Sequence, residues 1–205
     1  MTASWSIRRL DRLEGEHVDA LVGVLIDCVD GGASVSFMQP LSYDRAAAFW
    51  RRVSDDVEAG RRALIIAEDG QGICGTVQVL LDQPENQLHR ADVAKMLVHR
   101  RARRRGLGAA LMQAAEATAR QSGKLLLVLD TVTDGDAARL YERLGWVRVG
   151  DIPRYALRPS GGLCSTTVFY RNLDLAGTSQ LEAPSNRSLQ ADDHRGRSAP
   201  SAGRR

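Results

Sequence analysis

Apolar positions in the first 60 residues recur at intervals of three and four, the spacing of a helix that buries one face. This spacing predicts helices over residues 14–29 and 44–58. A short strand over residues 5–10 precedes them. The loop between the two helices mixes apolar with small polar residues and contains Pro40, so it is expected to lack regular structure.

From residue 63 the pattern changes to short apolar runs that are separated by glycine-containing or polar turns. Three such runs predict successive antiparallel strands over residues 63–67, 73–81 and 91–98. Gly75 interrupts the second run and indicates a β-bulge there.

The second half of the chain alternates helix and strand. An amphipathic helix is expected from Leu107 to the terminating Gly123, and the apolar run over residues 125–130 predicts a strand covered on both faces. Short links through the helix imply that this strand and its predecessor run parallel. The remaining pattern predicts a helix over 134–144 and strands over 146–149 and 162–173. The fold class is α/β with a mixed, mostly antiparallel sheet.

The 205-residue chain is long enough for one domain with its own core. Residues 1–173 carry all the periodic segments and are predicted to form that domain. Residues 174–205 are predicted to lie outside this domain. From residue 177 to 205 the sequence contains only two leucines, no aromatic residue, and many Ser, Ala, Gly, Arg and Pro. Such a composition buries too little apolar surface to offset chain entropy, so a disordered tail is expected.

Composition narrows the class of protein. The cysteines Cys28, Cys74 and Cys164 are odd in number and widely spaced, which fits a reducing cytoplasm and neither a disulfide framework nor a zinc site. No apolar run approaches the roughly 20 residues that span a bilayer. We therefore expect a cytoplasmic protein with no metal and no membrane partner. Lys95 and Lys124 are the only lysines among 28 basic residues.

The chemistry is concentrated in the turn that follows the strand over residues 91–98. Arginines fill most of positions 100–105, and Gly106 and Gly108 open the next helix. A helix start offers unpaired amides and a positive dipole end, so the turn suits a phosphate-bearing ligand. A Rossmann fold places its glycines after the first strand, and a triphosphate loop needs Gly-Lys-Ser/Thr, so neither fits. The absence of interleaved aromatic residues argues against nucleic acid as the partner.

Two segments resemble motifs of the GCN5-related N-acetyltransferase (GNAT) family. A strand ending in Val98 and the run Arg103-Arg104-Arg105-Gly106-Leu107-Gly108 resemble the acetyl-CoA signature [QR]-x-x-G-x-[GA]. The second motif, Asn-x-x-Ala-x-x-Leu-Tyr-x-x-x-Gly-Phe, is matched by Asp134, Ala137, Leu140, Tyr141, Gly145 and Trp146, with Asp in place of Asn and Trp in place of Phe. The resemblance covers residues 5–173 and implies the acyl-CoA N-acyltransferase fold, with a splayed parallel strand pair flanked by helices.

The resemblance implies that acetyl-CoA is the co-substrate and that acetyl passes directly to an amine, without an acyl-enzyme. Leu97 and Val98 are then expected to pair their backbone with pantetheine, as an added strand does. Arg103 and Arg104 are expected to meet the phosphates, while the other arginines of the run face water. The cofactor-binding set implied is Met96, Leu97, Val98, Arg103, Arg104, Gly106, Leu107, Gly108, Ala109, Asp134 and Ala137.

Acetyl transfer needs a group that accepts the ammonium proton and a group that protonates the leaving thiolate. Tyr141 matches the family tyrosine that protonates the thiolate. Asp92 and Asp130 are the candidate bases, at the start of one strand and the carboxyl end of the next. Simple alternation places Asp92 on the same face as Met96 and Val98. An exposed aspartate is a weak base, so burial or a water relay is required.

The acceptor is expected to be a small-molecule amine, bound by the loop between the first two helices and by the late strands. The residues implied are Ser34, Phe37, Met38, Gln39 and Tyr155. The segments RADVAKMLV, LDT and STTVFYR resemble the bacterial branch that contains the tabtoxin resistance acetyltransferase, which implies an amino acid-like antimetabolite or antibiotic as acceptor. A monomer or homodimer is expected.

Three other functions remain open at this stage. A catalytically weak acyl-CoA sensor could use the same fold, and it would have no need of Tyr141 and the two acids. A protein N-acetyltransferase would use the same chemistry on a polypeptide amine. A nucleic-acid binder using the arginine run would show steep salt dependence.

Overall fold

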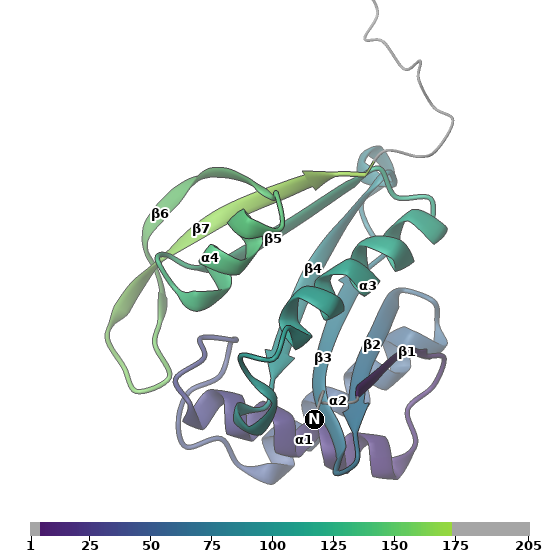
Figure 1. Ribbon diagram of the computed structural model, residues 1–205, viewed down its shortest axis with the longest axis vertical. Coiled ribbons are helices and arrows are strands. Elements are labelled where there is room, and N and C mark those ends of the chain that lie inside the picture. The colour runs from purple at the N-terminus through teal and green to yellow at the C-terminus, as the bar shows by residue number, and fades with distance from the viewer. Residues whose placement is uncertain (1–4, 174–205) are drawn as a thin grey trace, which may run out of the picture. The chain divides into compact units, whose positions relative to one another are not determined.

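The computed structural model describes residues 5–173, and the predicted tail over residues 174–205 lies outside them. Seven strands form one sheet in the order β1-β2-β3-β4-β5-β7-β6 (Figure 1). The strands are β1 (Trp5–Leu10), β2 (Arg62–Asp69), β3 (Gly72–Leu80), β4 (Arg90–Val98), β5 (Leu126–Val132), β6 (Val147–Leu157) and β7 (Leu163–Asn172). The helices are α1 (Gly15–Asp30), α2 (Tyr43–Glu58), α3 (Leu107–Gln121) and α4 (Asp136–Arg143).

The fold class predicted from the sequence is confirmed. Five of the six strand pairings are antiparallel, and β4 with β5 forms the parallel pair. The successive antiparallel strands β2, β3 and β4 and the crossover through α3 are as predicted. None of the helices in the described residues is both long and apolar enough to cross a membrane.

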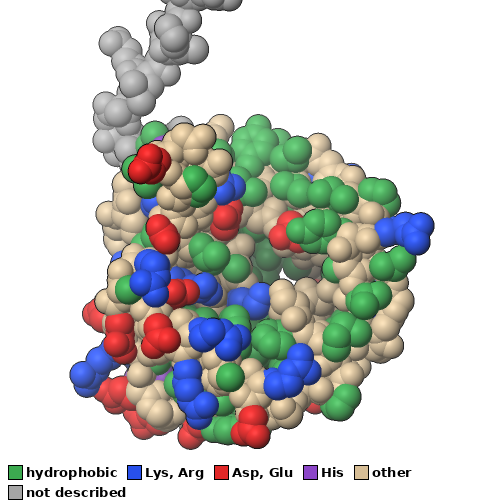
Figure 2. All heavy atoms as spheres, turned by 180° about the vertical axis from the view of Figure 1, so that it is seen from behind, with side chains coloured by type: hydrophobic (Ala, Val, Ile, Leu, Met, Phe, Trp, Pro, Cys, Tyr) green, Lys and Arg blue, Asp and Glu red, His purple; other side chains and the backbone are tan. Residues whose placement is uncertain are grey.

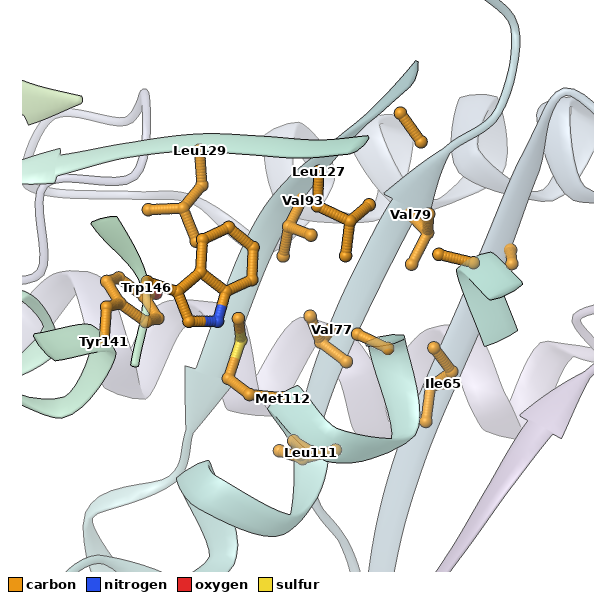
Figure 3. Packing of buried hydrophobic residues seen from close by; sticks show 14 of the residues in the cluster. Ile65, Val77, Val79, Val93, Leu111, Met112, Leu127, Leu129, Tyr141 and Trp146 are labelled. Carbon is orange, nitrogen blue, oxygen red and sulfur yellow. The ribbon is translucent and has the colours of Figure 1, made fainter. Parts of the chain in front are cut away.

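Two hydrophobic cores lie on the two faces of the sheet. Helices α1 and α2 pack on one face around Trp50 and Leu64. Helices α3 and α4 pack on the other face, where Leu127 and Phe169 are fully buried. Figure 3 shows part of this second core, with strand side chains packed against α3. The two faces are called the α1–α2 face and the α3–α4 face below.

Strands β4 and β5 separate soon after they start. They pair only where Arg90, Ala91 and Asp92 meet Leu126, Leu127 and Val128. On its other edge β5 pairs with β7 along its whole length, from Leu126 opposite Asn172 to Val132 opposite Thr166. The two strands therefore form a fork whose open end points toward the helix starts of α3 and α4. The fork exposes backbone on the inner edges of both strands.

A β-bulge in β4 sits beside the fork. Gln78 pairs with Ala94 but Thr76 pairs with Leu97, so β4 contributes one more residue than β3. Lys95, within this interval, has the left-handed φ of 49°. An extra residue reverses which side chains face which side of the sheet. Residues before and after Lys95 therefore follow opposite alternations.

Most predicted elements are found, with several differences. The predicted bulge at Gly75 is confirmed, since Ala67 pairs with Gly75 while Glu68 pairs with Ile73. Strand β6 is longer than predicted and continues through two register shifts to residue 157. Strand β5 is not covered on both faces, because one face lines a cavity that the apolar sequence run does not reveal.

Candidate active site

A cavity of about 1160 Å³ opens at the fork between β4 and β5. Its walls come from the α1–α2 loop, the end of β4, the turn into α3, the end of β5, α4 and the β6–β7 hairpin. Figure 2 shows the surface from the α1–α2 side, where a hollow lies between a region rich in charged side chains and a rim with many hydrophobic side chains. Elements far apart in the sequence thus share one site.

The turn into α3 forms the first wall. Gly106 adopts the left-handed φ of 82°, and Arg104 before it also has a positive φ, of 59°. The first helical bond of α3 joins Ala110 N to Gly106 O, and no side chain of the described part caps the helix. The amides of the first turn of α3 thus remain open toward the cavity, an arrangement that suits an anion.

Gly108 has a different role from Gly106. A Cβ built on Gly108 would come within 3.1 Å of Leu140 Cδ2 and 3.9 Å of Met96 Sδ. The absence of a side chain at Gly108 therefore lets α3 approach α4 closely. Gly106 supplies the backbone conformation and Gly108 supplies the room, so the two glycines of the motif serve two separate needs.

The first two arginines of the basic run anchor the turn. The backbone N and Nε of Arg100 each donate to Asp27 at 2.8 Å, which ties the turn to α1. Burial alone would raise the pKa of Asp27, but these hydrogen bonds outweigh it and hold that pKa below its usual range. Arg101 pairs with Asp69. The expectation that these two arginines only face water is wrong, and their acidic partners carry no local sequence signal.

Arg103 and Arg104, the next two arginines of the run, line the cavity. Arg103 Nε donates to Val98 O at 2.9 Å, and its Nη2 lies 3.8 Å from Cys28 Sγ. Arg104 is highly exposed, with Asp136 as a loose ionic partner at 3.7 Å. Arg104 is therefore able to reorient toward a ligand phosphate at little cost.

Tyr141 lies on α4 with its ring buried in the α3–α4 core. Tyr141 is 5% exposed, and its ring packs against Trp146 at a centroid distance of 6.0 Å (Figure 3) and against Phe169 at 5.9 Å. Trp146 is fixed by a 3.1 Å hydrogen bond from its Nε1 to Glu116. Burial and the charge of Asp130 raise the pKa of Tyr141, so its phenol remains protonated. Within residues 5–173 its hydroxyl makes no hydrogen bond, so it can donate to a ligand.

Asp130 ends the buried part of β5 and lines the same cavity. Leu129 before it packs into the α3–α4 core, so alternation turns Asp130 toward the α1–α2 face. The hydroxyl of Thr166 lies 2.8 Å from both Asp130 Oδ2 and Thr131 O. Asp130 is exposed within the cavity, and a ligand amine can reach it.

Asp92 does not line the cavity. Its carboxylate pairs with Arg90 at 3.2 Å and accepts a hydrogen bond from Gln83 at 3.2 Å. The predicted shared face with Met96 and Val98 is wrong, because the bulge at Lys95 reverses the alternation between them. Asp92 lies where β4 and β5 are still paired, at the closed end of the fork.

The other candidates divide in the same way. Four of the predicted acceptor-binding residues line the cavity, namely Ser34, Phe37, Met38 and Tyr155, but Gln39 does not. Every member of the predicted cofactor-binding set lines it except Asp134. The Gln39 side chain donates to Val29 O at 2.7 Å and thus holds the loop to α1. Asp134 forms the turn before α4 with a φ of 59°.

Sequence reasoning missed several cavity residues, among them Ser36, Lys95 and Thr166. The rarity of lysine in the chain was the one signal that pointed to Lys95. In the described residues there is no cluster of three His, Cys, Asp or Glu side chains that could hold a metal.

Comparison with known proteins agrees with this geometry. Residues 60–148 match the family model described as an acetyltransferase (GNAT) domain. That segment contains both strands of the fork, the turn into α3 and Tyr141. The fold is that of the GNAT acetyltransferases.

Solved structures with this fold come from several bacteria. The Salmonella typhimurium protein yncA, solved with its cofactor acetyl-CoA, has a TM-score of 0.68 and 17% identity, covering 86% of this chain and 98% of that one. A GCN5-related N-acetyltransferase from Kribbella flavida has a TM-score of 0.67 and 23% identity, and the match covers 82% of this chain and 98% of that one. The ribosomal-protein-alanine N-acetyltransferase from Brucella melitensis has a TM-score of 0.69 and 16% identity, and the match covers 82% of this chain and 99% of that one. At these identities the likeness concerns the fold.

Proposed function

We propose that this protein is a GNAT enzyme that transfers acetyl from acetyl-CoA directly to a primary amine of a small molecule. The observation that carries the proposal is one cavity joining three features: an open helix start, a strand fork and a protonated tyrosine. The resemblance of the sequence motifs and the match over residues 60–148 support the same activity.

The residues fit acetyl-CoA in a consistent order. The open amides at the start of α3, with Arg103 and Arg104, would hold the phosphates. The edge of β4 freed at the fork, near Leu97 and Val98, would pair with the amides of pantetheine. Bound acetyl-CoA supplies the activated thioester.

Two side chains would handle the protons. Tyr141 keeps its phenolic proton, so its hydroxyl can donate to the sulfur that leaves. Asp130 faces the acceptor side and would attract the ammonium form of the amine, then take its proton directly or through water. Asp92 is left out of this scheme because its carboxylate is engaged by Arg90 and Gln83.

The small size of the acceptor is supported by hydrogen bonds that join two walls of the cavity. Gln39 N donates to Pro159 O at 2.9 Å and Ser34 Oγ donates to Leu157 O at 3.3 Å, which joins the α1–α2 loop to the β6–β7 hairpin. These hydrogen bonds bound the acceptor side. A polypeptide substrate needs an open groove, so the geometry favours a small molecule over a protein amine. The segments that resemble the tabtoxin resistance branch lie on β4, β5 and β7, around this region.

The test is thiol release from acetyl-CoA with a panel of small amines and with peptide N-termini. We expect release that depends on a small amine and matches the acetylated product mole for mole. Release only with peptides would move the acceptor to protein. Tight acetyl-CoA binding without release would identify a sensor.

A further inference from the structure

The two lysines of the chain have different surroundings, which is informative because arginine supplies nearly all other cations. Lys124 is 7% exposed, and its Nζ donates at 2.8 Å to both Leu81 O and Leu88 O. Those carbonyls satisfy it as a structural group. Lys95 lines the cavity, and within residues 5–173 its only hydrogen bond goes to Ser36 Oγ at 3.2 Å. An ammonium has three donors, so Lys95 retains capacity for a ligand.

The backbone holds Lys95 toward the acceptor side. The bulge in β4 gives it a φ of 49°, and its partner Ser36 has a φ of 74°. Non-glycine residues rarely adopt such angles, and those that do gather at functional sites. The Nζ of Lys95 lies over the Phe49 ring of α2, 5.8 Å from the ring centroid, in a cation–π contact. These contacts hold the side chain on the α1–α2 face.

Opposite charges lie on the two separating strands. Lys95 is on β4 and Asp130 is on β5, and both line the cavity. Asp130 acts on Lys95 through space and not through a hydrogen bond. Burial lowers the pKa of Lys95, and the charge of Arg62 nearby adds to the effect. A bound anion would relieve this unfavourable environment.

We propose that the acceptor carries a carboxylate as well as its amine, and that Lys95 binds this carboxylate while Asp130 faces the ammonium group. The substrate class is therefore amino acids and close analogues. This inference rests on the proposed acetyl transfer and adds the chemical class of the acceptor. It also gives a role to a half-buried lysine at a bulge in a chain that is otherwise rich in arginine.

The test compares each common L-amino acid with the amine that its decarboxylation leaves, so that the members of a pair differ only in the carboxylate. We expect the wild-type protein to favour the amino acid in at least one pair by about tenfold or more in kcat/KM, mainly through KM. Lys95→Met should remove this preference by lowering kcat/KM for the amino acid far more than for its matched amine. Lys95→Arg should retain part of it. Arg45→Met, which removes an exposed cation of α2, should retain all of it.

A binding measurement separates this inference from acetyl transfer itself. With coenzyme A present, calorimetry should show that N-acetyl-L-amino acids bind the wild-type protein at least about tenfold more tightly than they bind Lys95→Met. If the enzyme acetylates amines with and without carboxylate equally well, or Lys95→Met slows both alike, the carboxylate site is wrong and acetyl transfer stands. If no acetyl transfer occurs but N-acetyl-L-amino acids still need Lys95, the site stands and the activity is wrong. If neither acetyl transfer nor binding of N-acetyl-L-amino acids is observed, both the proposed activity and the carboxylate site are wrong.

Discussion

The two halves of the cavity are built in different ways. The half proposed for the cofactor comes from one continuous stretch, in which β4 leads into the turn and α3, with α4 added beside it. The acceptor half combines the α1–α2 loop, the bulge in β4, the end of β5 and the β6–β7 hairpin. The first half depends on backbone geometry, which a short motif encodes. The second depends on side chains that only tertiary structure brings together, so its chemistry can vary while the first half stays the same.

The largest effect is expected at Gly106. A valine there would be forced into the left-handed region at φ 82° and would turn the amides of α3 away from the phosphates. Gly106→Val should reduce acetyl-CoA binding below detection by calorimetry. Gly123→Val is the matched control, since Gly123 also has a positive φ, of 71°, at the other end of α3. Gly123→Val should lose comparable stability and keep its affinity for acetyl-CoA. Normal acetyl-CoA affinity in Gly106→Val would refute the proposed phosphate site at the start of α3.

Removing the hydroxyl of Tyr141 tests the point where the two halves meet. Tyr141→Phe should lower kcat by about 100-fold with little change in acetyl-CoA affinity, because only proton donation is lost. Tyr43→Phe, at an exposed tyrosine that bonds Asp19, is the control and should act as wild type. The raised pKa of Tyr141 has a further consequence: its phenol stays protonated beyond the usual range near pH 10. A rate decline below that pH that vanishes in Tyr141→Phe would contradict this assignment.

The two aspartates distinguish the open end of the fork from its closed end. Asp130→Asn should lower kcat/KM for the amine by about tenfold or more, since the cavity loses its only proposed base. Asp92→Asn should change it less than about threefold, because Asp92 is bound to Arg90 and Gln83 outside the cavity. Steady-state kinetics with both variants decides the matter. The reverse order of effects would restore Asp92 as the base.

The smallest effect is expected at Asp27, which supports the cofactor half from α1. Asp27→Asn weakens two hydrogen bonds to Arg100 and should cost about 1–3 kcal/mol in unfolding free energy. The pKa of Asp27 is lowered in the folded state. Its contribution is therefore present above the ordinary aspartate pKa of about 3.9 and is lost as pH falls through the lower folded-state value. Denaturant melts at pH 7 and at pH 3 should show a smaller difference between variant and wild type at the lower pH.

Much of the fold was predictable from local patterns. The helices, the three antiparallel strands and the parallel crossover follow from apolar spacing and from the position of the glycines. The bulge at Gly75 was also predictable, because glycine inside a strand marks such a site. The bulge at Lys95 was not, since no residue type announces it, and that single extra residue reversed the face assigned to Asp92.

The candidate site was predictable only where a motif is continuous. The sequence indicated the turn at Gly106 and the tyrosine at 141, and both line the cavity. It did not indicate the hydrogen bonds that Arg100 and Arg101 donate to Asp27 and Asp69, which join residues 73 and 32 positions apart. Nor did it indicate the meeting of Lys95 with Ser36, which depends on the path of the α1–α2 loop.

The central claim is direct transfer of acetyl across the fork to a small amine, and a thiol-release assay with parallel mass spectrometry tests it most directly. Wild-type protein and acetyl-CoA should release thiol only when a suitable amine is present, with one acetylated amine formed for each thiol and no acetylated protein before the amine is added. Thiol release without an amine, or an acetylated protein that forms first and then passes acetyl on, would contradict the account.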